Sequence, residues 1–267
     1  MVGIPLNRME EGSKNSTEKD PGIISEDEVS GEGDITTRWK DVKGSTSTED
    51  FQNRWKIACA VVTEPDVDFS DLSSIGELIH ALPDNSSLQL GNSNSVRLAQ
   101  LFEMPPSVGV FCNRGTNGIE GSLSTAVGYA AISVNPTFLL IGDLSFFYDM
   151  NGLWNHYRTG NLRILLNNNG GGEIFGMLPG LNKSEVLHEY IAAAHTTEAK
   201  AWAEQQGFLY FSVHSKQDME KHLPLFTDLS CKKPILLEVF TSMDKNAEQI
   251  RSYYHRQKSV FTENNLG

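Results

Sequence analysis

The sequence has few cysteines, and they are widely spaced. Cys59, Cys112 and Cys231 are too few and too far apart for a disulfide framework, and their spacing matches no familiar metal site. Because unpaired cysteine is usually interior, we expect three buried, reduced thiols. The sequence also lacks any run of roughly 18 apolar residues, and its N-terminus lacks the basic-then-apolar order of a signal peptide. These absences predict a cytoplasmic protein without a membrane-spanning segment.

Basic residues are also in short supply. Lysine and arginine together number 22, against 34 aspartates and glutamates, for a net charge of −12. A nucleic-acid surface would need a basic face, so this balance argues against a nucleic-acid partner. A small anion can still bind, but only where a local cluster or a bound cation outweighs the overall charge. The hydrophobic content of 39 % is sufficient for an ordinary soluble core.

Large apolar residues are scarce over residues 1–50. This segment contains "EEGSKNSTEKD", "SEDEVSGEGD" and "KGSTSTED", which are polar and rich in glycine and serine. Such a composition cannot bury enough apolar surface to offset the entropy lost on ordering. We therefore expect a tail or linker over residues 1–50. A folded domain is expected over residues 51–267, and it opens with an amphipathic lead-in helix in "FQNRWKIACAVV".

From about residue 68 the sequence alternates between strand-like and helix-like segments. Apolar runs of strand length cover residues 86–92, 107–113, 137–143, 162–168, 207–213 and 234–240. Helical periodicity covers residues 73–82, 95–102, 120–132, 147–157, 186–206, a stretch near Asp218, and 243–258. The strands are almost wholly apolar, as expected when helices cover both faces of a sheet. The pattern predicts an α/β fold with a doubly wound, mostly parallel six-stranded sheet, whose ligands bind at the carboxyl ends of the strands.

Two of these strand ends carry unusual residues. Gly142 and Asp143 end one strand, and Ser145 is the candidate N-cap of the helix that follows. Another strand runs into the asparagines 167–169 and the glycines 170–172, where backbone carbonyls are exposed. A helix start favours an anion, yet Asp143 would repel a phosphate, so a cation must lie between them. A carboxylate, an amide oxygen, a main-chain carbonyl, phosphate oxygens and water form the octahedral shell that Mg²⁺ prefers, and the pattern predicts a magnesium diphosphate site.

These residues also resemble a known motif. "GD", followed across a helix and a strand by "NN", is similar to the diphosphate motif of thiamine-diphosphate enzymes. The longer strings "GDLSFFYDMNGL", "NNNGGGEIF" and "LPG", together with "LGNSNSVR" and "NRGTNGIEGSLSTAVGYA", resemble the 2-succinyl-5-enolpyruvyl-6-hydroxy-3-cyclohexene-1-carboxylate synthases of menaquinone biosynthesis. The resemblance covers roughly residues 66 to 260. It corresponds to the C-terminal, diphosphate-binding domain of that family and implies thiamine diphosphate with Mg²⁺ or Mn²⁺ as cofactors.

The resemblance implies a role for each matching residue. The residues that it places at the cofactor are Ile119, Gly142, Asp143, Leu144, Ser145, Asn169 and Gly171. Within this set, Asp143, Asn169 and the carbonyl of Gly171 would hold the metal, and Ile119 would keep the cofactor folded. The residues that it places at the substrates are Ser93, Arg97 and Arg114, of which the arginines suit carboxylates. Ile174, Phe175 and Leu178 would form the apolar wall beside the thiazolium ring.

Structural roles remain open for these same residues. The metal set could be an ordinary helix start with an asparagine–glycine turn, the arginines could form salt bridges, and the apolar residues could belong to the core. His156, His188 and His195 fall in predicted helices without a carboxylate or cysteine partner at ligand spacing. We therefore expect no metal-binding or acid–base role for these histidines.

The resemblance also implies a reaction and partners. In the family, the ylid of the cofactor attacks 2-oxoglutarate, CO₂ leaves, and the resulting carbanion adds to the β-carbon of isochorismate. A pyrimidine-binding domain of the same enzyme, with its cofactor-activating glutamate, has no counterpart in this sequence, so we expect no synthase activity from these residues alone. The resemblance also implies a homodimer or homotetramer. Two alternatives stay open. One is another thiamine-diphosphate 2-oxo acid decarboxylase or synthase, and the other is a non-catalytic magnesium diphosphate-binding module.

Overall fold

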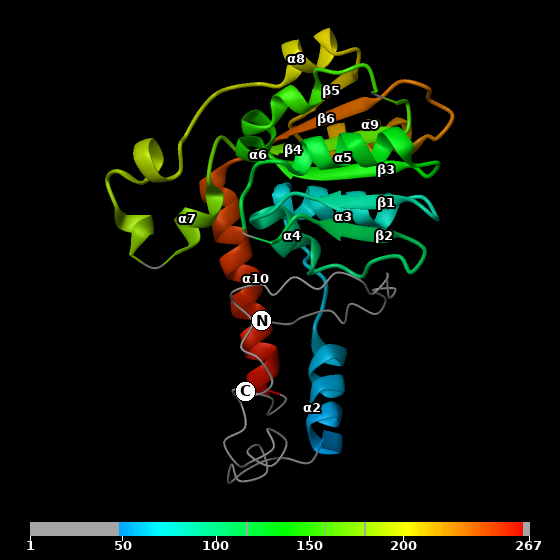
Figure 1. Cartoon of the computed structure of the whole chain (residues 1–267). Helices are drawn as coiled ribbons and strands as arrows, with labels where there is room; N and C mark the ends of the chain where they lie inside the picture. Colours follow the sequence, from blue (N-terminus) through cyan, green and yellow to red (C-terminus); the bar gives the residue numbers. More distant parts are fainter. Residues whose placement is uncertain (1–47, 116, 158, 179, 264–267) are drawn as a thin grey trace, which may run out of the picture. The chain divides into compact units, whose positions relative to one another are not determined.

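The computed structural model describes residues 48–115, 117–157, 159–178 and 180–263 (Figure 1). The chain divides into two compact units, one of residues 63–259 and one of residues 1–62 with 260–267. Most of the tail predicted over residues 1–50 therefore lies outside the described residues. The predicted lead-in is the helix α2 (Thr48–Val61), on which Phe51 and Trp55 stack with their ring centroids 6.4 Å apart.

The larger unit is built on one six-stranded sheet with the order β2-β1-β3-β4-β6-β5. All neighbouring strands pair in parallel. The strands are β1 (Ser87–Leu90), β2 (Gly109–Cys112), β3 (Thr137–Gly142), β4 (Leu162–Asn168), β5 (Leu209–Val213) and β6 (Ile235–Phe240). Each lies within one of the six predicted strand segments. The prediction of a doubly wound parallel sheet is confirmed.

Helices pack on both faces of this sheet, as Figure 1 shows. The first face is covered by α3 (Asp71–Ala81), α4 (Asn94–Ala99), α9 (Lys216–Thr227) and α10 (Met243–Glu263). The opposite face is covered by α5 (Ser122–Ile132), α6 (Asp143–Tyr148), the 3₁₀ turn η2 (Met150–Leu153) and α8 (Lys200–Gln205). The short elements α7 (Glu173–Met177), η3 (Leu181–Lys183) and η4 (Leu187–Ile191) follow β4.

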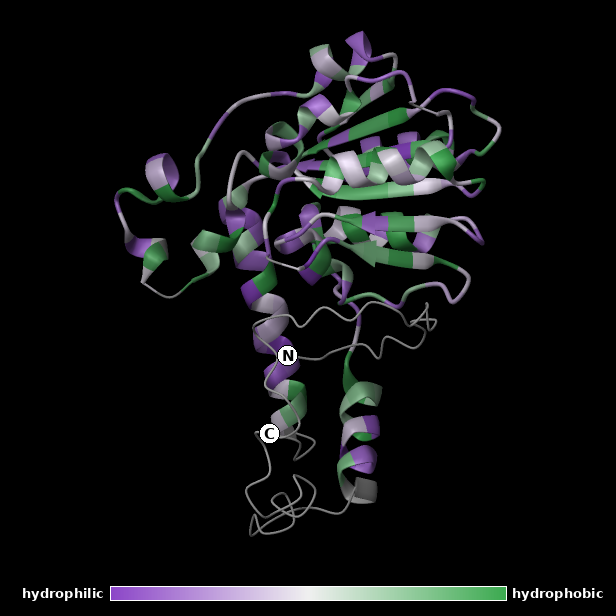
Figure 2. Cartoon of the chain, viewed as in Figure 1, coloured by the Kyte–Doolittle hydropathy of each residue, from purple (hydrophilic) through white to green (hydrophobic). Residues whose placement is uncertain are grey.

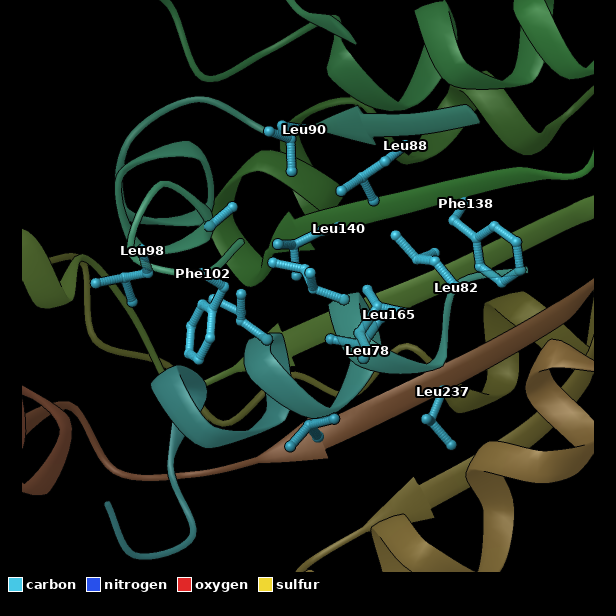
Figure 3. Close-up of a cluster of buried hydrophobic side chains, with 14 of the residues drawn as sticks. Leu78, Leu82, Leu88, Leu90, Leu98, Phe102, Phe138, Leu140, Leu165 and Leu237 are labelled. Atoms are coloured by element: carbon cyan, nitrogen blue, oxygen red, sulfur yellow. The ribbon is translucent and has the colours of Figure 1, made fainter. Parts of the chain in front are cut away.

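Alternation along each strand divides the apolar side chains between two cores. Phe138 and Leu140 of β3 enter the cluster on the first face, whereas Leu139 and Ile141 enter the cluster on the opposite face. Figure 3 shows the first cluster, in which side chains from neighbouring strands meet those of α3 and α4. Both faces are therefore dry, which is why the strands are predominantly hydrophobic in Figure 2.

The helix after β3 differs from its prediction. It begins at Asp143, with Gly142 at its N-cap and no side-chain capping bond, so the assignment of Ser145 as N-cap was wrong. The helix also stops at Tyr148, although helical periodicity continues to residue 157. The next residue, Asp149, accepts a hydrogen bond from the Ser124 N–H at 2.7 Å and so caps the start of α5. The chain continues as the 3₁₀ turn η2 rather than as an α-helix.

The single helix predicted over residues 186–206 was also wrong. The structure has the π-helical turn η4, an irregular stretch, and then α8. Ala193 has a positive φ of 50°, which ends the helical path. The main chain then binds the glycine run: the Ala192 carbonyl accepts from the Gly172 N–H at 2.6 Å, and the His195 N–H donates to the Gly170 carbonyl at 2.9 Å. Tertiary hydrogen bonding has overridden local helix propensity here.

The cysteines are free but are not buried as we expected. Cys59 is exposed, and Cys112 and Cys231 are partly buried.

Within the described part of the chain, no helix is both long and apolar enough to cross a membrane.

Candidate functional site

A cavity of ≈ 130 Å³ lies at the carboxyl ends of β1, β3 and β4. The chain runs from β1 outward to β2 and then returns to β3 on the other side of β1, so the strand order reverses between β1 and β3. Ligands of open α/β sheets bind at such a reversal. The predicted residues that line the cavity are Ser93, Ile119, Gly142, Asp143, Leu144, Ser145, Asn169, Gly171, Ile174 and Phe175.

Asp143 joins two of these strand ends. The residue is only 2 % exposed, and Oδ1 accepts from the Leu144 N–H at 2.6 Å. Oδ2 accepts from the Gly170 N–H at 2.8 Å and from the Gly171 N–H at 2.9 Å. The carboxylate therefore fixes the glycine loop after β4 against the start of α6, as the two strand ends suggested.

The glycine loop needs its glycines. Gly170 has a φ of +87° and Gly171 a φ of +149°, values that L side chains rarely adopt. A Cβ at Gly171 would also lie 2.6 Å from the Ala192 carbonyl oxygen, which belongs to the backbone and cannot move freely. A bare backbone at this position lets the segment after η4 close over the loop.

His195, which has no carboxylate at ligand spacing in the sequence, lies beside Asp143 in the structure. Its Nε2 lies 3.3 Å from Asp143 Oδ2. Its Nδ1 accepts from the Thr197 N–H at 3.1 Å, so the proton of a neutral ring is on Nε2, which forms no hydrogen bond among the described residues despite its closeness to the carboxylate. The ring also packs edge-on against Phe147, with centroids 5.4 Å apart. The sequence could not show this contact, because His195 lies in the irregular stretch that returns to the loop rather than in the predicted helix.

Two further carboxylates, Asp71 and Glu173, line the cavity and were not predicted from the sequence. They are 3 % and 4 % exposed. Asn169 Nδ2 donates to Asp71 Oδ2 at 2.7 Å and to Glu173 Oε2 at 3.0 Å. Burial raises the pKa of both carboxyl groups, that of Glu173 well above its ordinary value, and the charge of Asp71 raises the pKa of Glu173 further. The sequence contains only weak indications that these two acids belong to the site. Glu173 directly follows the glycine run, and Asp71 stands at the start of a helix.

The remaining predicted residues lie outside the cavity lining. Arg114 is connected to it, because Nη1 donates at 3.1 Å to Oδ1 of Asn92, a lining residue. Arg97 is exposed in the last turn of α4. Leu178 follows α7 and is 42 % exposed. The structure thus brings Arg114 near the cavity but does not join Arg97 or Leu178 to it.

Ser93 carries backbone strain at the cavity wall. It has a φ of 67°, which is uncommon for a residue other than glycine. Such strain persists only where the surroundings impose it, and it gathers at functional sites. The strained residue lies directly after β1, at the same reversal of strand order.

The donor atoms at the loop fit a hard divalent cation. Among the described residues, no group of three or more histidine, cysteine, aspartate or glutamate side chains could hold a metal. A metal would instead need a mixed oxygen set of one carboxylate, one amide oxygen and one main-chain carbonyl. Asp143, Asn169 and Gly171 offer these atoms at one end of the sheet, and oxygen ligands suit Mg²⁺.

Several curated proteins are similar to this chain in sequence, although no protein-family model matches it. A 2-succinyl-5-enolpyruvyl-6-hydroxy-3-cyclohexene-1-carboxylate synthase of Bacteroides fragilis is 49 % identical over 213 residues. The match covers 79 % of this chain and 38 % of the B. fragilis protein. The synthase of Phocaeicola vulgatus is 52 % identical over 206 residues, or 77 % of this chain and 37 % of its own length. The chain thus spans little more than a third of these relatives.

Solved structures share the fold. The benzoylformate decarboxylase of Polynucleobacter necessarius matches 68 % of this chain with a TM-score of 0.53 and 17 % identity. The thiamine diphosphate-dependent 4-hydroxybenzoylformate decarboxylase of Rhodococcus jostii RHA1 matches 67 % with a TM-score of 0.52 and 19 % identity. These matches cover 35 % and 34 % of the respective chains. At such low identity they support the fold and no more.

Proposed function

Since the chain belongs, over its matched residues, to the family of 2-succinyl-5-enolpyruvyl-6-hydroxy-3-cyclohexene-1-carboxylate synthases, we propose that it supplies the magnesium diphosphate half of such an enzyme's site. The observation that carries the proposal is the meeting of Asp143, Asn169 and Gly171 at the reversal of strand order. The reaction proposed for the complete site is decarboxylation of 2-oxoglutarate and addition of the resulting four-carbon unit to isochorismate.

Different residues of this chain would bind the metal and the apolar part of the cofactor. The carboxylate of Asp143, the amide oxygen of Asn169 and the carbonyl of Gly171 would hold Mg²⁺, whose positive charge would favour binding of the diphosphate of thiamine diphosphate. When bound, that cofactor supplies a carbon centre that stabilises the negative charge formed when a 2-oxo acid loses CO₂. Ile119, Ile174 and Phe175 line the same cavity and would offer its apolar part.

The proposed substrates are both anionic acids. Three carboxylates line the cavity, so a substrate anion needs a cationic group at its edge. Arg114 is suited to this task because a guanidinium meets a carboxylate with two parallel hydrogen bonds. Its position beside Asn92 sets it at the end of β2, next to the cavity wall.

The test is an activity assay with a second protein. The 267-residue chain is assayed for CO₂ release from 2-oxoglutarate with isochorismate present, both alone and after addition of the part of the B. fragilis synthase that it does not match. We expect no turnover by the chain alone and turnover in the mixture, which Asp143→Asn abolishes. Turnover by the chain alone would contradict the proposed division of the site. Turnover in the mixture only with other 2-oxo acids would favour a different thiamine-diphosphate enzyme.

A further inference from the structure

The side-chain amide of Asn169 is held between two acids from distant elements. Asp71 begins α3 and Glu173 begins α7, yet both accept from Asn169 Nδ2. The amide nitrogen of Asn169 is thus the atom that faces the two acids, and it can donate to a carboxylate oxygen of each. Oδ1 must therefore face the opposite way. It lies 3.3 Å from the Gly171 N–H, on the side where Asp143 also binds the glycine loop.

The two acids are themselves held in place. Thr241 Oγ1 donates to Asp71 Oδ1 at 2.5 Å, and the Asp71 N–H donates to Asn246 Oδ1 at 3.2 Å. Asn246 Nδ2 then donates to Thr241 Oγ1 at 3.0 Å and to Glu173 Oε2 at 3.5 Å. The end of β6 and the first turns of α10 thus fix the acids that contact Asn169. The network closes on itself, so none of its members can rotate independently.

This arrangement of buried acids is not expected to stabilise the fold. Among the described residues, neither Asp71 nor Glu173 forms an ion pair with a basic side chain, and both are buried. Glu173 Oε1 also has no hydrogen-bond partner in that part of the chain, although it is fully enclosed. Burying two acids without a cationic partner costs free energy even when neutral groups donate hydrogen bonds to them. Their common contact, Asn169, indicates what they are for.

We propose that Asp71 and Glu173 are positioning residues that turn the amide oxygen of Asn169 toward the metal. The inference rests on the proposed function, because it presumes that Asn169 is a metal ligand. Without the two acceptors the amide could rotate and present its nitrogen, which cannot coordinate a cation. The acids would then set metal affinity without touching the metal, as outer partners of metal ligands commonly do.

The test measures metal-dependent binding rather than turnover. Thiamine diphosphate is titrated into the full 267-residue chain by calorimetry at a series of Mg²⁺ concentrations. Glu173→Met removes the acceptor but keeps the length and burial of the side chain, and we expect it to weaken Mg²⁺ binding roughly 10- to 100-fold. Glu173→Gln keeps an acceptor oxygen and should restore most of the affinity. Glu238→Gln is the matched control, because Glu238 is a buried acid on β6 that binds Asn168 and not Asn169.

A double-mutant cycle separates positioning from a general structural role. In an Asn169→Ala background, Glu173→Met should have no further effect on Mg²⁺ affinity, because the group that it orients is gone. Additive losses, or unchanged affinity in Glu173→Met, would overturn the inference. Asp71→Ala is the second variant if Glu173→Met does not fold, and the same outcomes apply to it. Failure of the proposed function looks different: the wild-type chain would then show no Mg²⁺-dependent binding, or Asn169→Ala would leave that binding intact.

Discussion

Of the two arginines predicted to bind substrate, Arg114 is the one whose contacts connect it to the cavity. Through Asn92 it is tied to the cavity wall, whereas Arg97 is exposed on α4. In the mixture with the second protein, we expect Arg114→Ala to raise KM for 2-oxoglutarate or isochorismate and to leave thiamine diphosphate affinity nearly unchanged. Loss of a charge-assisted hydrogen bond costs on the order of 1.5 to 3 kcal/mol, or roughly 10- to 100-fold. Steady-state kinetics and calorimetry measure the two effects.

Arg97→Ala serves as the companion variant, because the resemblance implies the same role for this arginine. An equal effect would mean that Arg97 reaches the substrate from the surface. If either variant weakened cofactor binding as much as substrate use, that arginine would instead be structural.

Glu238 is a buried acid whose burial should make stability depend on pH. Its donors are Asn168 Nδ2 at 2.8 Å, the Ala199 N–H at 3.0 Å and Tyr210 Oη at 2.7 Å. Burial nevertheless raises the pKa of Glu238 above its ordinary value of 4.5. With a raised folded-state pKa, its contribution to stability is fully present below about pH 4.5 and is lost as pH rises through the folded pKa.

We therefore expect wild type to lose stability relative to Glu238→Gln as the pH rises above 4.5. The variant has no ionisable group at this position, so it lacks this contribution to the pH dependence. Urea unfolding of both proteins at a series of pH values gives the difference in unfolding free energy. If the difference in unfolding free energy stayed constant with pH, burial would not be raising the pKa of the Glu238 carboxyl group.

The ease of prediction differed among individual site residues for a physical reason. Asp143 and Asn169 could be found in the sequence because each follows an apolar strand, and parallel strands bring their carboxyl ends to one edge. Asp71 could not, since it reaches Asn169 across 98 positions through the packing of α3. The contact of His195 was hidden for the same reason, because it depends on a segment that leaves its helical path.

At the scale of an element, the loop between β4 and α7 should tolerate no side chain at Gly171. Its positive φ opposes one, and so does the Ala192 carbonyl oxygen, which would lie 2.6 Å from an added Cβ. We expect Gly171→Ala to reduce the free energy of unfolding by about 1 to 3 kcal/mol and to weaken Mg²⁺-dependent binding. Thermal unfolding and calorimetry measure these effects.

Gly176, within α7, provides the matched control. A Cβ there meets nothing within 4 Å, so Gly176→Ala should leave stability unchanged or raise it by up to about 1 kcal/mol. If both variants lost similar amounts of unfolding free energy, a side chain at Gly171 would be no more destabilising than one at Gly176.

The strands could be predicted more fully than the helices. Apolar runs indicate buried strands because both faces of a parallel sheet must be dry. Arg163 in β4 is an exception that the sequence could not explain: it is 1 % exposed, and its guanidinium donates to backbone carbonyls including those of Phe226 and Asp228. No single helix forms over residues 186–206, because the main chain of Ala192 and His195 forms hydrogen bonds with the glycine loop. Such partners are invisible to local periodicity.

For the whole molecule, the overall charge bears on whether the proposed diphosphate can bind. The chain has a net charge of −12, and Asp71, Asp143 and Glu173 all line the cavity. A diphosphate alone would be repelled by these carboxylates. A divalent cation held by Asp143 and Asn169 would offset part of this charge and attract the diphosphate, so we expect binding of thiamine diphosphate to depend strictly on metal.

The most direct test is calorimetric titration of thiamine diphosphate into wild type and Asp143→Asn, with Mg²⁺ and with chelator. We expect metal-dependent binding by wild type and no measurable binding by Asp143→Asn, whose neutral amide cannot balance the ion. The control is Asp149→Asn, which alters an acid after α6 that caps α5 and should retain binding. Circular dichroism verifies that the variants remain folded. Unchanged affinity in Asp143→Asn, or equal affinity of wild type with and without metal, would contradict the account.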